Sequence, residues 1–214
     1  MFKNKHIVIT GGSSGLGLEM ARRLIKQGAK ITLVARNSKK LVRAQAELLL
    51  INANAEVYIR SIDVSNDIGV AQTVEGIAER FSGIDVLINN AGVLKEGSIE
   101  TLSMEDYRQV MEVNYFGVVN MTKAALPYLI KSRGRIVNIS SVAGLTTVYG
   151  YSSYASSKHA LVGFTETIRY ELKPKGVTVQ LVCPGEFESP MVDELNTYRT
   201  EENKAHTQTL QPTS

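Results

Sequence analysis

Short runs of β-branched and other apolar residues alternate along the chain with longer segments in which apolar residues recur every three or four positions. The short runs predict six buried strands, over residues 6–10, 30–35, 56–60, 84–88, 135–139 and 177–182. The periodic segments predict helices near residues 15–28, 37–53, 66–81, 103–131 with a break, and 152–173. The chain therefore alternates between strand and helix over most of its length.

This alternation predicts an α/β protein. Strands joined by helices run parallel, with right-handed crossovers that place helices on both faces of the sheet. We expect a doubly wound parallel sheet of the Rossmann type, in three α/β/α layers, within one domain over residues 1–192. Residues 193–214 are polar and have no strand-like run, so we expect a substrate-loop or tail segment with one short helix at most and a mobile end.

Composition and charge exclude several classes of protein. The chain has 214 residues, of which 43% are hydrophobic and 21% charged, and this excludes disorder, collagen and coiled coil. The net charge of +3 is spread along the sequence without a run of like charges, so we expect no nucleic-acid partner. The single cysteine, Cys183, excludes an internal disulfide. No apolar stretch approaches the roughly 20 residues of a membrane span, and we expect a cytoplasmic protein.

A glycine-rich segment follows the first predicted strand and leads into a helix. Its glycines allow close approach of a pyrophosphate, whose charge the N–H groups and the positive end of the helix stabilise. A plain tight turn is the alternative, but the position at the end of the first strand of a βαβ unit favours a dinucleotide. The residues expected to bind the cofactor are Gly11, Ser13, Ser14, Gly15, Leu16 and Gly17.

The end of the second strand indicates which dinucleotide binds. NAD enzymes usually have an acidic residue there for the ribose diol, whereas this chain has Ala35 followed by Arg36. A guanidinium pairs with a 2′-phosphate, and the missing carboxylate removes a repulsion. The pattern favours NADP(H) over NAD(H), although a solvent-facing arginine on a loop is the alternative.

The last predicted helix contains Tyr154 and Lys158, four positions apart and so on one helix face. An ordinary tyrosine titrates near pH 10, and a nearby positive charge lowers its pKa toward the range of a useful acid or base. Such a tyrosine can donate a proton to a carbonyl oxygen or accept one from an alcohol. The pair alone is a weak signal that occurs by chance on many helices.

Five motifs in order give that pair its weight, and with them the chain resembles the short-chain dehydrogenase/reductase family from residue 5 to about residue 190. The matching segments are Thr10-Gly11-x-x-x-Gly15-x-Gly17, Asp63-Val64, Asn89-Asn90-Ala91-Gly92, the tetrad Asn114, Ser141, Tyr154 and Lys158, and Pro184-Gly185. The resemblance implies an oxidoreductase that moves hydride between a nicotinamide and a carbonyl or alcohol carbon.

The resemblance also implies roles for these residues. Tyr154 would be the general acid or base, Lys158 would lower its pKa and hold the nicotinamide ribose, and Asn114 would support a proton-relaying water. Ser141 would bind the substrate oxygen; Ser140 competes for this role, but Ser141 has the family spacing of thirteen positions before the tyrosine. The cofactor contacts so implied are Asp63, Val64, Asn90, Ala91, Gly92, Tyr154, Lys158, Pro184, Gly185 and Ser189.

The expected substrate pocket is apolar, with no arginine or histidine that stands out as a carboxylate clamp. Its walls are expected from Val93, Leu94, Leu145, Val148, Tyr149, Phe187, Met191, Val192 and Leu195. Within the family, residues 10–15 and 31–37 are similar to 3-ketodihydrosphingosine reductases, which implies an apolar long-chain ketone and NADPH. The three histidines have no ligand spacing, so we expect no catalytic metal.

Two alternatives stay open at this stage. A non-catalytic NADPH sensor or scaffold of the same fold would keep the cofactor loop, and an isomerase or dehydratase would use the nicotinamide transiently. Family members carry a further helix and a seventh strand after the substrate loop, so the expected sheet lacks its usual last strand. The family also forms dimers or tetramers through its two long helices, which implies a homo-oligomer.

Overall fold

Six parallel strands form one sheet in the computed structural model, which describes residues 2–146, 148–186 and 189–210. The strands are β1 (His6–Thr10), β2 (Lys30–Ala35), β3 (Val57–Ser61), β4 (Val86–Asn89), β5 (Arg135–Ile139) and β6 (Thr178–Val182), in the spatial order β3-β2-β1-β4-β5-β6. In register, Ile7 of β1 pairs with Ile31 of β2 and with Val86 of β4. The predicted doubly wound sheet is confirmed, and its strand order reverses between β1 and β4, where such sheets bind ligands.

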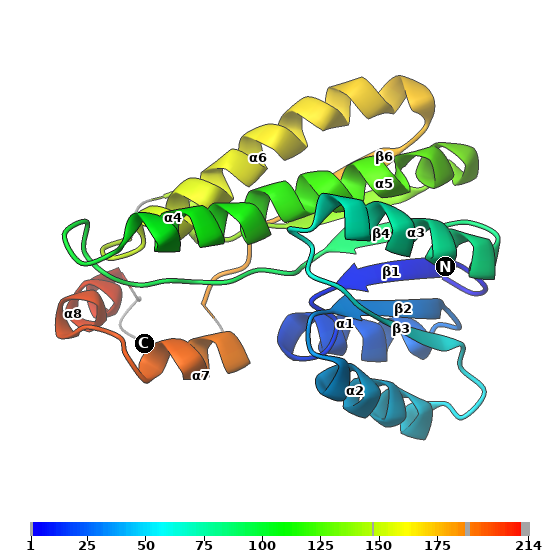
Figure 1. Cartoon of the computed structure of the whole chain (residues 1–214), viewed down its shortest axis with the longest axis horizontal. Coiled ribbons are helices and arrows are strands. Elements are labelled where there is room, and N and C mark those ends of the chain that lie inside the picture. The colour runs from blue at the N-terminus through cyan, green and yellow to red at the C-terminus, as the bar shows by residue number, and fades with distance from the viewer. Residues whose placement is uncertain (1, 147, 187–188, 211–214) are drawn as a thin grey trace.

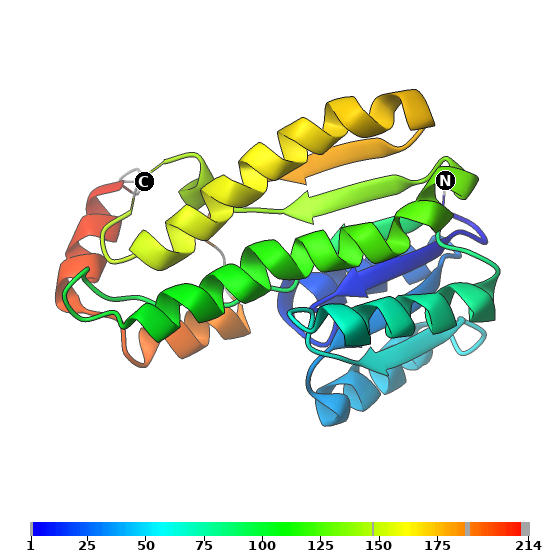
Figure 2. The ribbon, with the colours of Figure 1, turned by 45° about the horizontal axis from the view of Figure 1, so that its top comes forward.

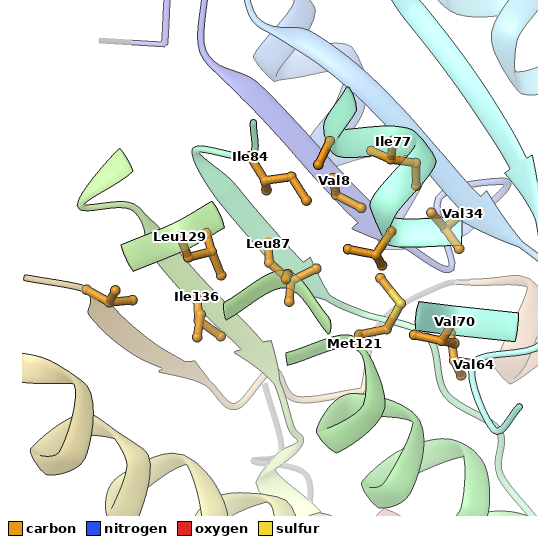
Figure 3. Packing of buried hydrophobic residues seen from close by; sticks show 14 of the residues in the cluster. Val8, Val34, Val64, Val70, Ile77, Ile84, Leu87, Met121, Leu129 and Ile136 are labelled. Atoms are coloured by element: carbon orange, nitrogen blue, oxygen red, sulfur yellow. The ribbon is translucent and has the colours of Figure 1, made fainter. Parts of the chain in front are cut away.

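Helices cover both faces of the sheet (Figure 1). On one face α1 (Gly15–Ile25) and α2 (Ser38–Ile51) pack on Ile7 and Ile9 of β1. On the other face α3 (Asp67–Phe81), α5 (Gly117–Ser132) and α6 (Ser152–Leu172) pack on the cluster that contains Val8 and Leu87 (Figure 3). Because side chains alternate along a strand, neighbouring residues of β1 fill the two separate cores.

The expected break between residues 103 and 131 is a π-helical turn, η1 (Glu112–Phe116), that joins α4 (Met104–Met111) to α5 without interruption. Ser103 caps α4 by accepting a hydrogen bond from the Asp106 N–H, and the Asp106 carboxylate accepts one from the Ser103 N–H. The π-helical turn contains Asn114, whose buried side chain bonds to the backbone of Val93 in the loop after β4. The break that the sequence pattern predicts is therefore a π-helical turn that joins Asn114 to the loop after β4.

Two helices follow β6 in place of the single short helix expected at most. They are α7 (Pro190–Asn196) and α8 (Glu201–Leu210), and the side chain of Ser189 begins α7 by accepting from the Val192 N–H at 3.3 Å. The expectation was wrong because tertiary contacts, such as those of the buried Leu195, stabilise short polar helices that show no apolar periodicity in the sequence. Figures 1 and 2 show α7 and α8 at the end of the molecule where α4 and α6 begin.

Two short 3₁₀ turns complete the described structure: η2 (Val142–Gly144), after β5, and η3 (Lys173–Lys175), after α6. Among the helices of the described ranges, none has the length and apolar character needed to cross a membrane. The domain boundary at residue 192 stays a prediction.

Candidate active site

A cavity of about 710 Å³ opens at the carboxyl ends of the central strands and extends toward α7. Most of the residues expected in the site line it: Gly11, Ser13, Ser14, Gly15, Leu16, Arg36, Asp63, Val64, Asn90, Ala91, Gly92, Ser141, Tyr154, Lys158, Pro184, Gly185 and Ser189. Gly17 and Asn114 do not line the cavity. Segments that lie far apart in the sequence thus meet at one opening.

Hydrogen bonds between the end of β1 and the loop after β4 hold the glycine loop in place. The hydroxyl of Thr10 accepts from the N–H groups of Asn90 and Ala91, at 2.9 and 3.0 Å. The amide of Asn90 donates to the carbonyl oxygens of Thr10 and Gly11, at 3.0 and 3.3 Å. The glycine-loop motif and the Asn89-Asn90-Ala91-Gly92 motif, which are far apart in the sequence, are therefore joined by hydrogen bonds in the structure.

The glycine loop and the start of α1 fit a bound phosphate. Gly11 has a φ of 64°, and a Cβ there would lie 2.9 Å from the Asn90 amide nitrogen. Ser14 precedes α1 without making a side-chain cap, and the first turn of α1 has no acidic residue, which suits an anion at the N–H groups of this helix end. Gly17 was expected to contact the cofactor, but it packs the helix: its Cβ would lie 2.4 Å from the Gly11 carbonyl oxygen.

Arg36 and Asp63 lie at the end of the cavity beside β2 and β3. The Arg36 Nη1 atom is 3.7 Å from the Asp63 Oδ2 atom, and both side chains are partly exposed. The other Asp63 oxygen accepts from the N–H and the hydroxyl of Ser65. Lys40, an exposed residue of the first turn of α2, lines the same cavity. Lys40 is absent from the residues predicted for the site; its position in the first turn of the helix that follows Arg36 is the signal that would have found it.

The catalytic candidates gather where β5 meets the first turns of α6. Ser141 hydrogen-bonds with the buried phenol of Tyr154, while Ser140 donates to the Lys158 carbonyl oxygen at 3.1 Å. The Lys158 ammonium donates to the Ile139 carbonyl oxygen at 3.0 Å and lies 5.5 Å from the centre of the Tyr154 ring. Of the two serines, Ser141 is thus the one beside the phenol.

The electrostatics of this group differ from the expected lowering of the tyrosine pKa by lysine. Burial raises the pKa of Tyr154, and the hydrogen bond from Ser141 lowers it by a smaller amount. Burial also lowers the pKa of Lys158 to about 8, since a charged ammonium is poorly solvated there. The lowering of the Tyr154 pKa by Lys158 stays a prediction.

Asn114 is fully buried behind the cavity. Its Oδ1 atom accepts from the Val93 N–H at 2.8 Å, and its Nδ2 atom donates to the Val93 carbonyl at 2.9 Å and to the Ser157 hydroxyl at 3.0 Å. Ser157 in turn donates to the carbonyl oxygen of Tyr154 at 2.7 Å. Asn114 therefore joins the loop after β4 to the helix that carries the tyrosine.

The substrate end of the cavity is apolar, with walls from the loop after β4 and from α7. The expected residues that line it are Val93, Leu94, Val148, Met191, Val192 and Leu195. Leu145 and Tyr149 were expected there too, but neither lines the cavity, and both are exposed to solvent. Phe187 lies outside the described residues.

An arginine that the sequence analysis did not single out lies beside this apolar end. The Arg199 side chain is only 8% exposed and pairs with Glu186, which lines the cavity. Burial raises the pKa of Tyr151 to about 12, and the nearby charge of Arg199 opposes that rise. No periodicity or motif marks Arg199, since the pairing joins two loops.

This geometry agrees with a comparison of the whole chain with known families. The family model described as short chain dehydrogenase matches residues 5–200. The chain belongs to the short chain dehydrogenase family. The chain thus has a Rossmann sheet, and one cavity at its edge holds both the glycine loop and the group of Ser141, Tyr154 and Lys158.

Similar proteins include enzymes of several names. A 3-dehydrosphinganine reductase of Danio rerio is 37% identical over 95% of this chain, and the match spans 63% of that relative's length. A solved actinorhodin polyketide ketoreductase variant with NADPH is 34% identical, with a TM-score of 0.87 over 96% of this chain and 82% of that one. An NAD⁺-bound xylitol dehydrogenase is 31% identical, with a TM-score of 0.83 over 86% of this chain and 71% of that one.

Proposed function

We propose that this short chain dehydrogenase is an NADP(H)-dependent oxidoreductase that interconverts an apolar ketone and the corresponding secondary alcohol. The observation that carries the proposal is the position of Ser141, Tyr154 and Lys158 on the same cavity as the glycine loop. A cavity of about 710 Å³ has room for a dinucleotide's reactive half and a substrate carbonyl beside the phenol.

The nicotinamide, when bound, supplies or accepts the hydride. Gly11, Ser13 and the first N–H groups of α1 would hold its phosphates, because these groups line the cavity at a positive helix end. Lys158 would bind the nicotinamide ribose from its place behind Gly92, where a Cβ on the glycine would lie 3.6 Å from the ammonium nitrogen.

The proton would move at the Tyr154 oxygen. In reduction the phenol donates its proton to the substrate oxygen, and a pKa raised by burial keeps that proton in place until the carbonyl arrives. Ser141 would donate to the same substrate oxygen as negative charge develops there. Asn114 would act behind the site, by holding Val93 and Ser157 in register with Tyr154.

The cofactor preference rests on the surroundings of Arg36. A 2′-phosphate beside β2 would contact the Arg36 guanidinium and the Lys40 ammonium. The Asp63 carboxylate also lies here, and its Oδ2 atom is 3.7 Å from the Arg36 Nη1 atom, so it pairs with a basic group. Structures of this fold occur with either dinucleotide, so the two basic groups carry this part of the proposal.

The substrate would be a ketone with a long apolar chain. The wall of valine, leucine and methionine side chains described above supports an apolar substrate. The relative of Danio rerio, named a 3-dehydrosphinganine reductase, supports a long-chain 3-keto compound within that class. The chain spans 63% of that relative, so substrate and activity are proposals for the chain as given.

The test combines cofactor binding with turnover. Purified protein is titrated with NADPH and NADH by thermal unfolding, and a ligand at a hundred times its Kd is expected to stabilise the fold by roughly 2.7 kcal/mol. NADPH-dependent reduction of a long-chain 3-keto compound is then measured for the wild type and for Tyr154→Phe, which is expected to bind NADPH normally and to lose turnover. Binding of NADPH without turnover of any ketone by the wild type would refute the enzyme and favour the sensor or scaffold.

Two further features stay proposals. We expect a homo-oligomer through α5 and α6, since Phe116 before α5 and Tyr170 on α6 are large hydrophobic residues exposed to solvent. Light scattering after size exclusion would measure the number of subunits. Location in the cytoplasm would be checked by cell fractionation.

A further inference from the structure

We propose that Glu96 and Arg199 are positioning residues that hold α7 over the substrate end of the cavity. Glu96 lies in the loop after β4, and Arg199 lies between α7 and α8. Neither residue belongs to the motifs above, and the inference rests on the proposed function, since a covered ketone site is what this arrangement would serve.

Glu96 is a buried carboxylate with two partners on one residue of the α7–α8 connection. Its Oε1 atom accepts from the Thr200 hydroxyl at 2.7 Å, and its Oε2 atom accepts from the Thr200 N–H at 3.2 Å. The residue is only 8% exposed, so these bonds replace the water that a free carboxylate would bind. Glu96 therefore fixes the end of the segment that follows α7.

The loop before α6 closes on the same carboxylate. The Gly97 N–H donates to the Gly150 carbonyl oxygen at 2.9 Å, and a Cβ on Gly150 would lie 2.7 Å from the Glu96 Oε1 atom. Gly150 has a φ of 76°, which a glycine adopts without strain. The backbone of Gly97 and the backbone of Gly150 are thus packed closely enough around Glu96 to hold its carboxylate in position.

Arg199 fixes the segment to the loop that precedes α7. Its Nη1 and Nη2 atoms donate to the two carboxylate oxygens of Glu186, at 3.1 and 3.3 Å, in the bidentate arrangement that guanidinium favours. Its Nε atom donates to the Asn203 side chain, which in turn donates to the Tyr149 carbonyl oxygen, both at 2.5 Å. Arg199 thereby joins the β6–α7 loop, α8 and the loop before α6.

These contacts decide where α7 lies. The helix has seven residues, too few to be stable without tertiary contacts. Its buried Leu195 packs in a cluster with Tyr151 and Tyr154, and Met191 and Val192 line the cavity. An α7 released at its ends would remove this apolar wall from the phenol while leaving the glycine loop untouched.

The test replaces Glu96 and follows both mobility and kinetics. Glu96→Ala removes both acceptors of Thr200, and we expect backbone amides of residues 191–199 to exchange hydrogen about tenfold faster. We also expect the KM for the apolar ketone to rise about tenfold, with kcat and the Kd of NADPH changed less than about twofold. Glu100→Ala is the matched control, since Glu100 is an exposed residue of the same loop.

Conservative variants separate a holding role from a general loss of structure. Glu96→Gln keeps both contacts, because its carbonyl oxygen accepts from the Thr200 N–H and its amide donates to the Thr200 hydroxyl; we expect exchange and KM near those of the wild type. Thr200→Val keeps the N–H contact to Glu96 but removes the hydroxyl contact, together with the hydrogen bond that the hydroxyl accepts from the Asn203 N–H at 3.3 Å; it serves if Glu96→Ala does not fold. Arg199→Lys keeps the charge without the bidentate pair and is expected to exchange faster than the wild type.

The outcomes are distinct from those of the proposed function. Unchanged exchange over α7 in Glu96→Ala and Thr200→Val overturns the inference, as does a loss of ketone turnover as large in Glu96→Gln as in Glu96→Ala. A wild type that reduces no ketone overturns the proposed function instead. The exchange comparison needs no turnover, so it still decides whether Glu96 and Arg199 hold α7.

Discussion

Replacing Lys158 with methionine measures how much the site lowers the stability of the fold. Lys158 is 4% exposed, and burial lowers its pKa from 10.5 to about 8. At about 1.36 kcal/mol for each pH unit, this difference corresponds to about 3 kcal/mol of destabilisation wherever the ammonium is protonated in both states. Loss of the hydrogen bond to the Ile139 carbonyl oxygen offsets about 1 kcal/mol of this gain. The free energy of unfolding of Lys158→Met at pH 7 is therefore expected to exceed that of the wild type by about 2 kcal/mol.

The sign of the pH dependence distinguishes this cause from general packing. Between pH 8 and 10.5 the lysine is deprotonated in the folded protein first, so the wild type gains stability with pH and the advantage of Lys158→Met shrinks. Urea unfolding of the cofactor-free proteins at several pH values measures the difference. Lys123→Met, at an exposed position of α5, is the control and is expected to show no such trend. A Lys158→Met protein less stable than the wild type at pH 7, or an advantage that does not shrink as the pH rises, would refute the reasoning.

Three further substitutions test the cofactor loop, the cofactor preference and the phenol. Arg36→Ala is expected to weaken NADPH binding by about tenfold or more and to leave NADH nearly unchanged, as measured by fluorescence titration; equal losses would contradict the assignment. Gly17→Ala places a Cβ 2.4 Å from the Gly11 carbonyl oxygen, so the Tm is expected to fall and both dinucleotides to bind about tenfold more weakly. Ser141→Ala removes the bond that lowers the Tyr154 pKa, so the rise of alcohol oxidation with pH is expected to move to higher pH; an unmoved profile would exclude the bond as a cause.

The sheet and the core were predictable from local patterns. Apolar runs such as that at residues 6–10 become buried strands because only a fully covered parallel strand accepts such a run. The spacing of Tyr154 and Lys158 on one helix face also follows from sequence alone. Family motifs then led to Ser141 and to the glycine loop, both of which line the cavity.

Sequence alone thus determined the fold class and most of the residues that meet at the cavity. Only the tertiary structure decided how they contact one another, because hydrogen bonds between segments far apart in the chain leave no periodic signal. Thr10 supports Asn90, Asn114 holds Val93, and Glu96 accepts from Thr200 across a hundred or so positions. The buried Arg199 beside an apolar pocket was missed for the same reason: folding brings Glu186 and Asn203 to its guanidinium, and no periodicity or motif in the sequence marks these contacts.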